Sequence, residues 1–549
     1  MAPSLRDTTP GQQFDALVAG FIEDQCRLAP ENASFLGRTD YDHAVSDTSA
    51  DGFQEHHDRD RHWVRTFEDV DSSELSGSQR IDRELILARL GAEVATADFQ
   101  FWRRAPEQYV QDGVFNLFVH QARPQAEAVA AAVTRLAAVP QTVANATANL
   151  SADLACPEVL RRDLATVRGQ AQFLREDLPG FVQDPVLRQR LGDAAAPAAA
   201  AYDNLADHVD ALAEVAHGSY VFGEKNYNAV LQTGEQLSFN SHTLREMGRR
   251  EWDALNTKMG DVAQRINGGS RDWQTLLRTL QKQHAADMQG MLDEYTQTTQ
   301  RARQFVIDHD LATVPAGEHC DVLPAPAFER AAIAVASYFP PAPFLPGTKG
   351  TFNVPYTPDG STPTEDAERL ETNAHYEIPS TTAHEAYPGH HHHFVHMGRA
   401  SPLRHFLEST YFVEGWALYA EKMMGEHGFY RSDDELLGAL GARIFRAARI
   451  IVDTSLHLGE MSIDDAAQFM QVRGGLPESV AKAEALRYAA WPTQASAYLT
   501  GAIAIEEMRD RWLAEKRGTL REFHDAITGS GALPPGLAGR AVGLDPATD

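Results

Sequence analysis

Residues 382–393 read TAHEAYPGHHHH, so that His384 and Glu385 stand shortly before a run of four histidines. In hydrolytic zinc sites histidine nitrogens hold the metal, and a neighbouring carboxylate takes a proton from water. The common HExxH motif has its second histidine four residues after the first, but Pro388 occupies that position here. The segment therefore predicts a zinc-binding helix with a different ligand spacing.

The second histidine ligand is either His390 or His391. On an ideal helix each residue advances by about 100°, so His390 lies roughly 120° from His384 around the axis, whereas His391 returns to within about 20°. Proline removes a backbone donor and glycine accepts unusual dihedral angles, so Pro388 and Gly389 predict a kink or bulge. Because such a bulge can re-aim either side chain, helical spacing leaves both histidines open.

A third ligand is available in residues 413–421, which read VEGWALYAE. Glu414 and Glu421 are seven residues apart and therefore share one helix face. Glu414 is placed to bind the metal, and Glu421 to accept a hydrogen bond from the far nitrogen of a ligand imidazole. Because two histidines and one glutamate with an open fourth position form a known hydrolytic arrangement, we expect one Zn²⁺ per chain.

Each of these features also has a purely structural interpretation. Residues 382–385 match a capping box, in which Glu385 would only cap a helix. The two glutamates would form the solvent face of a polar helix, but their helix is largely apolar, and carboxylates in such surroundings usually have a partner. For the remaining histidines of this region we favour a solvated imidazole cluster, formed by His392, His393 and His396.

Together the motifs resemble one known family. The segment HEAYPGHH at 384–391, followed by EGWALYAE at 414–421, is similar to the bacterial DUF885 family, whose members are predicted zinc metallopeptidases with an HExxPGH-type motif. The similarity covers most of the chain, clearly from about residue 340 onward. It continues through RIIVDTSLH at 449–457, EALRY at 484–488 and PTQASAYLTG at 492–501.

The resemblance implies a helical fold like that of the oligopeptidase-like zinc enzymes. It also implies that His384, His390 and Glu414 are the metal ligands, and it favours His390 over His391. By the same resemblance Tyr498 is expected to hydrogen-bond the oxyanion that forms on a scissile carbonyl, although a helical tyrosine is more often a packing residue.

Four further polar residues lie downstream. Asp453 and His457 are four residues apart on a predicted helix, where the carboxylate can fix the imidazole tautomer. The pair then either supports a metal ligand or contacts substrate, or it only stabilises the helix. The planar guanidinium of Arg487 is suited to bind a substrate carboxylate, and Tyr488 lies beside it in the sequence. We expect Arg487 and Tyr488 to contribute to substrate binding.

Helical periodicity dominates the chain and predicts a mainly α fold with two lobes around a cleft. The N-terminal lobe would span 1–337 and a catalytic lobe 338–549, unless both form one continuous domain. Thr243 and Glu246 match a capping box that would start a helix, Pro197 marks a helix junction, and an irregular tail follows Gly529. The predicted helices are 79–99, 119–148, 156–178, 184–216, 241–266, 380–398, 402–426, 433–458, 463–472, 477–489, 493–514 and 518–527.

Proline and glycine are concentrated in residues 338–364, which makes this region the least helical part of the chain. Thr351–Val354 lies within it and predicts a small β element near 350–356. An extended segment there either forms a cleft wall that pairs with a peptide backbone or serves as an ordinary connector.

The chain has 549 residues and a formal net charge of −28, which argues against a nucleic-acid partner. No continuous apolar run reaches the ~18 residues of a membrane span, so no membrane partner is expected. Three widely separated cysteines indicate reduced thiols, and the N-terminus shows no secretory leader, so we expect a cytoplasmic monomer or homodimer.

The predicted function is that of a zinc-dependent metallohydrolase, a peptidase acting on short peptides or other small amides. Glu385 would accept the proton of water and deliver it to the departing amine. Two alternatives stay open at this stage. The substrate could be a specialised non-peptide amide, or the chain could be a non-enzymatic helical protein that sequesters metal.

Overall fold

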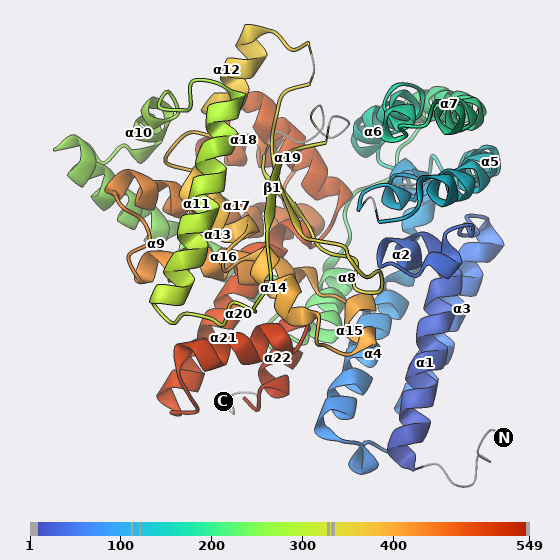
Figure 1. The fold of residues 1–549 in the computed structure, drawn as a ribbon, viewed down its shortest axis with the longest axis horizontal. Coiled ribbons are helices and arrows are strands. Elements are labelled where there is room, and N and C mark those ends of the chain that lie inside the picture. The colour runs from blue at the N-terminus through green and yellow to red at the C-terminus, as the bar shows by residue number, and fades with distance from the viewer. Residues whose placement is uncertain are drawn as a thin grey trace. The chain divides into compact units, whose positions relative to one another are not determined.

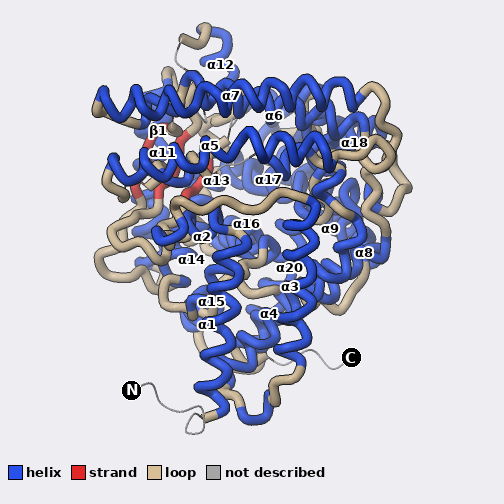
Figure 2. Tube along the Cα trace, turned by 90° about the vertical axis from the view of Figure 1, so that its right-hand side faces the viewer, coloured by secondary structure: helices blue, strands red, loops and turns tan. Residues whose placement is uncertain are grey.

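The computed structural model describes residues 9–110, 113–120, 122–326, 330, 335–358 and 360–544. Within these ranges most residues lie in helices, and one small sheet has three strands (Figures 1 and 2). The prediction of a mainly α fold with a small β element is therefore confirmed. The chain divides into two compact units.

The first unit comprises the chain up to residue 234 with the short segments 342–348 and 405–407. Its core lies where α5, α6 and α7 pack side by side, through buried residues such as Leu136, Leu164 and Leu205. A π-helical turn, Ala229–Gly234, ends the longest segment of the unit. Its helices are α1 (Pro10–Leu28), α2 (Pro30–Phe35), α3 (Ala50–Glu68), α4 (Gly77–Thr96), α5 (Gln125–Asn149), α6 (Pro157–Glu176), α7 (Pro185–Ala213) and α8 (Glu224–Asn228).

The predicted junction at Pro197 is wrong, because α7 continues through this residue. A proline inside a helix removes one backbone hydrogen bond and crowds the preceding turn. Here the neighbouring Ala198 and Ala199 are fully buried in the core of the unit. Packing of this alanine-rich face therefore outweighs the local cost of the proline.

The second unit comprises residues 235–341, 349–404 and 408–549. The predicted lobe boundary between 337 and 338 falls inside it, and the assignment of an N-terminal and a catalytic lobe stays a prediction. The remaining helices are α9 (Ser241–Asn267), α10 (Trp273–Leu280), α11 (Met288–Asp308), α12 (Pro363–Glu371), α13 (Ile378–Glu385), α14 (His390–Met397), α15 (Pro402–Phe406), α16 (Thr410–Glu426), α17 (Asp433–His457), α18 (Ile463–Val472), α19 (Glu478–Ala490), α20 (Gln494–Ala514), α21 (Leu520–Gly529) and α22 (Pro535–Ala541).

The sheet consists of β1 (Asp321–Pro324), β2 (Ser337–Phe339) and β3 (Thr351–Val354), in the order β1-β3-β2. Strand β3 pairs in parallel with β1 and antiparallel with β2. The strand predicted at 351–354 is confirmed, but it is the central strand. Because both of its edges are already hydrogen-bonded, β3 cannot pair with a peptide backbone.

Several predicted helix ends are corrected by the structure. Asn240, not Thr243, caps α9, because its side chain accepts a hydrogen bond from the Thr243 amide. The predicted helix 402–426 is divided into α15 and α16, and Ser409 caps the second of these. The tail predicted to be irregular contains α22, with Pro535 in its first turn, a position that tolerates proline.

Helices α16 and α20 cross at a pair of glycines, Gly415 and Gly501. A Cβ atom added to Gly415 would lie 2.5 Å from the carbonyl carbon of Gly501, closer than any side chain permits. Glycine at both positions therefore allows the two backbones to touch. The close crossing brings Glu414 on α16 and Tyr498 on α20 to the same part of the unit.

Candidate metal centre

The prediction of one helix over 380–398 is wrong, because α13 ends at Glu385 and α14 begins at His390. Between them the backbone of Gly389 passes directly over the end of α13. A Cβ atom at Gly389 would lie 1.8 Å from the carbonyl oxygen of His384, so only glycine fits. This turn brings the imidazole rings of His384 and His390 to 4.8 Å between centroids.

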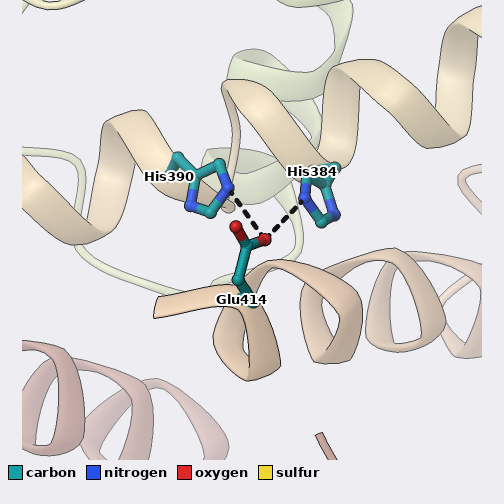
Figure 3. Close-up of side chains that lie close together, drawn as sticks. All are labelled: His384, His390 and Glu414. Atoms are coloured by element: carbon teal, nitrogen blue, oxygen red, sulfur yellow. Dashed lines mark ion pairs between the residues drawn. The ribbon is translucent and has the colours of Figure 1, made fainter. Parts of the chain in front are cut away.

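The structure brings His384, His390 and Glu414 together, as Figure 3 shows. Each offers one ligand atom, and these atoms all lie within 4.8 Å of one another. The Nε2 atoms of His384 and His390 lie 3.4 and 3.6 Å from Oε2 of Glu414. Two imidazole nitrogens and one carboxylate oxygen are a donor set for a divalent metal ion, so the residues present fit such an ion.

Glu421 lies two helical turns after Glu414 on the same face of α16, and it contacts the other nitrogen of the His384 ring. Its Oε1 atom accepts a hydrogen bond of 2.8 Å from Nδ1 of His384, and its other oxygen accepts one from Ser380. With Nδ1 acting as the donor, the lone pair of Nε2 faces Glu414 and is available to a metal. The predicted hydrogen bond between Glu421 and His384 is present, and the role of Glu421 at a metal site stays a prediction.

The charges around His384 also favour a cation. Burial opposes protonation of His384, but hydrogen bonds to Glu414 and Glu421 dominate and raise its pKa to about 10. Burial would raise the pKa of Glu414, yet the neighbouring imidazoles of His384 and His390 hold it well below its ordinary value. The carboxylates thus stabilise a positive charge at this place, which a proton or a metal ion can supply.

Glu385 follows His384 directly and is 9% exposed. Burial raises its pKa, while His384 and His390 partly oppose this. The capping interpretation of Glu385 is wrong, because α13 begins at Ile378 and Thr382 therefore lies inside the helix. Glu385 is a buried carboxyl beside two candidate ligands, and capping does not explain it.

Comparison with known proteins assigns the chain to a family. Residues 30–542 match the family described as bacterial protein of unknown function, DUF885. The chain belongs to this family. None of the curated proteins matches it.

Two solved structures share the fold of this DUF885 protein. One is a proposed lipoprotein of unknown function from Shewanella oneidensis, with a TM-score of 0.80, 20% identity and coverage of 96% of this chain and 99% of the other. The second is a proposed lipoprotein from Colwellia psychrerythraea, with a TM-score of 0.81, 18% identity and coverage of 97% and 98%. In the described part of this chain, every helix is too short or too polar to cross a bilayer.

His391 is a structural residue in this DUF885 protein. Its Nε2 atom lies 2.7 Å from a carboxylate oxygen of Glu318, and its Nδ1 atom lies 3.0 Å from the hydroxyl of Tyr338. Both nitrogens therefore have partners other than a metal. Of the two histidines that helical spacing left open, His390 is the one whose ring meets Glu414.

Glu318 was not recognisable from the sequence, since it lies 73 residues before His391 and belongs to no motif. Its carboxylate also accepts hydrogen bonds from Tyr387 at 2.5 Å and from Arg303 at 2.8 Å. Burial would raise the pKa of Glu318, but these three donors lower it to about 2. Glu318 thereby joins Tyr387 in the turn to His391 in the first turn of α14.

The prediction of a solvated imidazole cluster is wrong for His392 and His393. Both are buried, whereas His396 is partly exposed. His392 bonds through Nε2 to the backbone carbonyl of Thr313 at 3.0 Å. His393 packs against the ring of Phe412 at 5.2 Å between centroids.

Tyr498 on α20 is mostly buried and lies within electrostatic reach of the ligand group. Burial and the charge of Glu414 raise its pKa, while nearby arginines oppose this. Gln494 lies 3.4 Å from its hydroxyl. The position is compatible with the predicted role beside the metal, and the role itself stays a prediction.

Tyr488 and Arg487 are engaged with Glu484 on α19. The buried hydroxyl of Tyr488 donates to Glu484 and accepts a 3.0 Å hydrogen bond from Arg449. Arg487 donates to the same carboxylate at 3.1 Å and keeps its side chain 24% exposed. Arg487 thus retains access to solvent, whereas the hydroxyl of Tyr488 already has two protein partners.

Asp453 and His457 form a buried pair on α17, with Oδ1 and Nε2 3.7 Å apart. The Nε2 atom of His457 also lies 2.9 Å from the backbone carbonyl of Tyr488. This contact joins α17 to α19. It matches the structural interpretation of the pair.

Proposed function

We propose that this DUF885 protein is a metal-dependent hydrolase of peptide-like amide bonds. The observation that carries the proposal is the group of His384, His390 and Glu414, in which three ligand atoms converge beside Glu385. The donor set is that of hydrolytic zinc sites, so one Zn²⁺ per chain is the proposed cofactor. An oligopeptidase-like arrangement with two lobes around a cleft belongs to the same proposal.

Each step of the proposed reaction is assigned to a residue of the chain. A bound zinc ion would polarise the scissile carbonyl and acidify water. Glu385 accepts the proton of the attacking water and delivers it to the leaving amine. Glu421 holds His384 in the orientation that ligation needs, and the Tyr498 hydroxyl donates a hydrogen bond to the carbonyl oxygen as negative charge develops there.

The proposed partners are short peptides or small amides, and the proposed oligomeric state is a monomer or homodimer. A cytoplasmic location is supported by three free and buried thiols, Cys26, Cys156 and Cys320. The two solved relatives are described as proposed lipoproteins, which supports the cell envelope instead. Cell fractionation distinguishes these locations.

Replacing Glu385 with glutamine tests the mechanism. Protein purified without a nickel column is expected to contain one zinc per chain, because the three ligands are unchanged in Glu385→Gln. Hydrolysis of a short-peptide library should fall by about 10²–10⁴, the usual contribution of a general base. Metal content is measured by mass spectrometry and turnover by amine release.

Glu478→Gln is the matched control, since Glu478 is exposed and forms a surface ion pair with Lys482 on α19. This variant should retain both zinc and turnover. The mechanism is wrong if Glu385→Gln keeps wild-type turnover. The proposed function is wrong if the zinc-loaded wild-type protein releases no amine from any peptide.

A further inference from the structure

Three guanidinium groups gather around Tyr498. The Cζ atoms of Arg446 and Arg449, both on α17, lie 5.6 and 5.0 Å from the centroid of its ring. The charge of Arg487, from α19, also acts on the Tyr498 hydroxyl. We refer to Arg446, Arg449, Arg487 and Tyr498 as the Tyr498 cation group.

Among the described residues, the three arginines of this group have a single carboxylate in ion-pair contact. Arg449 and Arg487 share one carboxylate, that of Glu484, at 2.9 and 3.1 Å. Within the described part of the chain Arg446 has no carboxylate within 4.0 Å, although the protein has 77 acidic residues against 49 basic ones. One turn earlier on the same helix, Arg443 has its own partner in Glu506 at 2.8 Å.

Glu377 is an acidic residue within electrostatic reach of Arg446, but it is only a weak counter-ion. Its carboxylate already accepts a hydrogen bond of 2.6 Å from Tyr376. Burial raises the pKa of Glu377 to about 7, so a large part of it is neutral near that pH. Arg446 therefore lacks a close and fully ionised counter-ion among the described residues.

Two of the guanidinium groups also have a hydrogen-bond donor that is not used within the described part of the chain. The Nε atoms of Arg446 and Arg487 are buried and lack an acceptor among the described residues. A buried donor without an acceptor costs free energy, and a ligand oxygen would remove that cost. Both donors therefore favour an anion with more than one oxygen.

The group lies beside the candidate metal centre. Tyr498 is held there by the close crossing of α16 and α20 at Gly415 and Gly501. Burial and the charge of Glu414 raise the pKa of its hydroxyl, and the charges of the three arginines lower it. A substrate whose scissile bond reaches the metal ligands can place a nearby anionic group at these arginines.

We propose that the Tyr498 cation group binds the C-terminal carboxylate of a short peptide, with Arg446 making the main contact. The planar fork of a guanidinium matches the two oxygens of a carboxylate. This inference rests on the proposed function and narrows it, because a fixed C-terminus near the metal directs cleavage to the last bonds of the chain. The predicted role of Arg487 becomes a supporting one.

The test uses the full-length, zinc-loaded protein carrying Glu385→Gln, so that peptides bind without being consumed. The probes are N-acetyl-tetraalanine with a free carboxylate and the same peptide as its C-terminal amide. Calorimetry should show the acid binding about tenfold or more tightly than the amide, as expected for a charge-assisted hydrogen bond. Adding Arg446→Gln should bring the ratio of the two dissociation constants, amide to acid, close to one.

Two controls separate the cation group from other causes. Arg265→Gln removes an exposed cation that pairs with Asp433 on the surface, and it should leave the ratio unchanged. Zinc-free protein should still prefer the acid, since the preference comes from arginine rather than from the metal. Arg446→Lys keeps the charge and should retain part of the preference, which guards against a folding defect in Arg446→Gln.

Equal binding of the two peptides, or binding of neither, overturns the inference. A preference that survives in Arg446→Gln also overturns it. Hydrolysis of both peptides by the wild-type protein without preference would leave the proposed function standing and remove the carboxylate site. A binding preference without hydrolysis of any peptide would remove the proposed function and keep the carboxylate site.

Discussion

Four adjacent histidines at 390–393 have four different environments, and the partners of their ring nitrogens decide their roles. The first lies 3.6 Å from Glu414 in the ligand group. The second has protein partners at both nitrogens. The third bonds to a backbone carbonyl, and the fourth is buried among aromatic rings. Identical side chains therefore divide into one candidate ligand and three structural residues.

Replacing His390 or His391 with glutamine should affect different properties, zinc affinity in the first case and stability in the second. His390→Gln removes a ligand, so its zinc affinity should fall by more than the roughly 10- to 100-fold that loss of an outer partner costs. His391→Gln should keep one zinc per chain. It should unfold more easily, because the buried Glu318 loses a donor at a cost of about 1–3 kcal/mol.

Zinc content by mass spectrometry and thermal unfolding of both variants check these expectations. Zinc lost from His391→Gln and retained by His390→Gln would show that the second ligand is misassigned.

The three residues that converge as candidate ligands were predictable because the motifs that carry them are short and specific. Helical spacing could not choose between His390 and His391, and only the family resemblance favoured the first. The contacts that occupy His391 come from Glu318 and Tyr338, which are 73 and 53 residues away. Such contacts depend on the tertiary fold and leave no local pattern.

At the scale of elements, the centre depends on a break between two short helices. Helices α13 and α14 have eight residues each, and the four residues between them interrupt the helix. A continuous helix would hold His384 and His390 roughly 120° apart around its axis. The break places both imidazoles beside Glu414, which no straight helix over 380–398 would do.

Gly389→Ala should therefore damage metal binding more than an ordinary glycine substitution does. Its new methyl group would lie 1.8 Å from the His384 carbonyl oxygen and 2.4 Å from that of Ala383, and both are backbone atoms. The turn must shift, so His390 moves away from His384. We expect zinc affinity to fall by about tenfold or more, as when a ligand loses its support.

Gly529→Ala is the control, because a Cβ atom at Gly529 at the end of α21 would meet nothing within 4 Å. It should keep the zinc affinity of the wild type in the same competition titration with a chelator. Equal affinity in Gly389→Ala would show that the close approach at Gly389 does not position the ligands.

Long helices with regular periodicity were predicted well, as residues 433–457 and 463–472 show. Breaks between helices were harder to predict, for two opposite physical reasons. At Pro197 a strong local breaker lies inside a helix because packing holds the helix together. At 386–389 the sequence predicted only a kink, whereas the backbone of Gly389 turns back onto His384. Local propensity cannot rank these two outcomes.

At the scale of the whole molecule, the chain has a net charge of −28, and the ionisation of its buried carboxyl groups makes the free energy of unfolding depend on pH. Asp60 on α3 is 3% exposed, and its Oδ1 atom has no hydrogen-bond partner among the described residues. Burial, together with the charge of Glu93, raises its pKa to about 7. The folded first unit therefore favours the neutral carboxyl.

Asp60→Asn should stabilise the protein at pH 8 and have little effect near pH 4. The folded pKa lies above the unfolded value of 3.8, so the unfolded chain ionises first, and Asp60 costs stability increasingly from about pH 4 to pH 7. A gap of about three pKa units limits this cost to roughly 4 kcal/mol. Thermal unfolding at both pH values, with hydrogen exchange in α3, measures the difference.

Asp58→Asn is the control, because Asp58 lies at an exposed site on the same helix and pairs with Arg61. It should show no such pH-dependent gain in stability. A difference between Asp60→Asn and wild type that stays constant from pH 4 to pH 8 would mean that Asp60 ionises equally easily in the folded and unfolded chain.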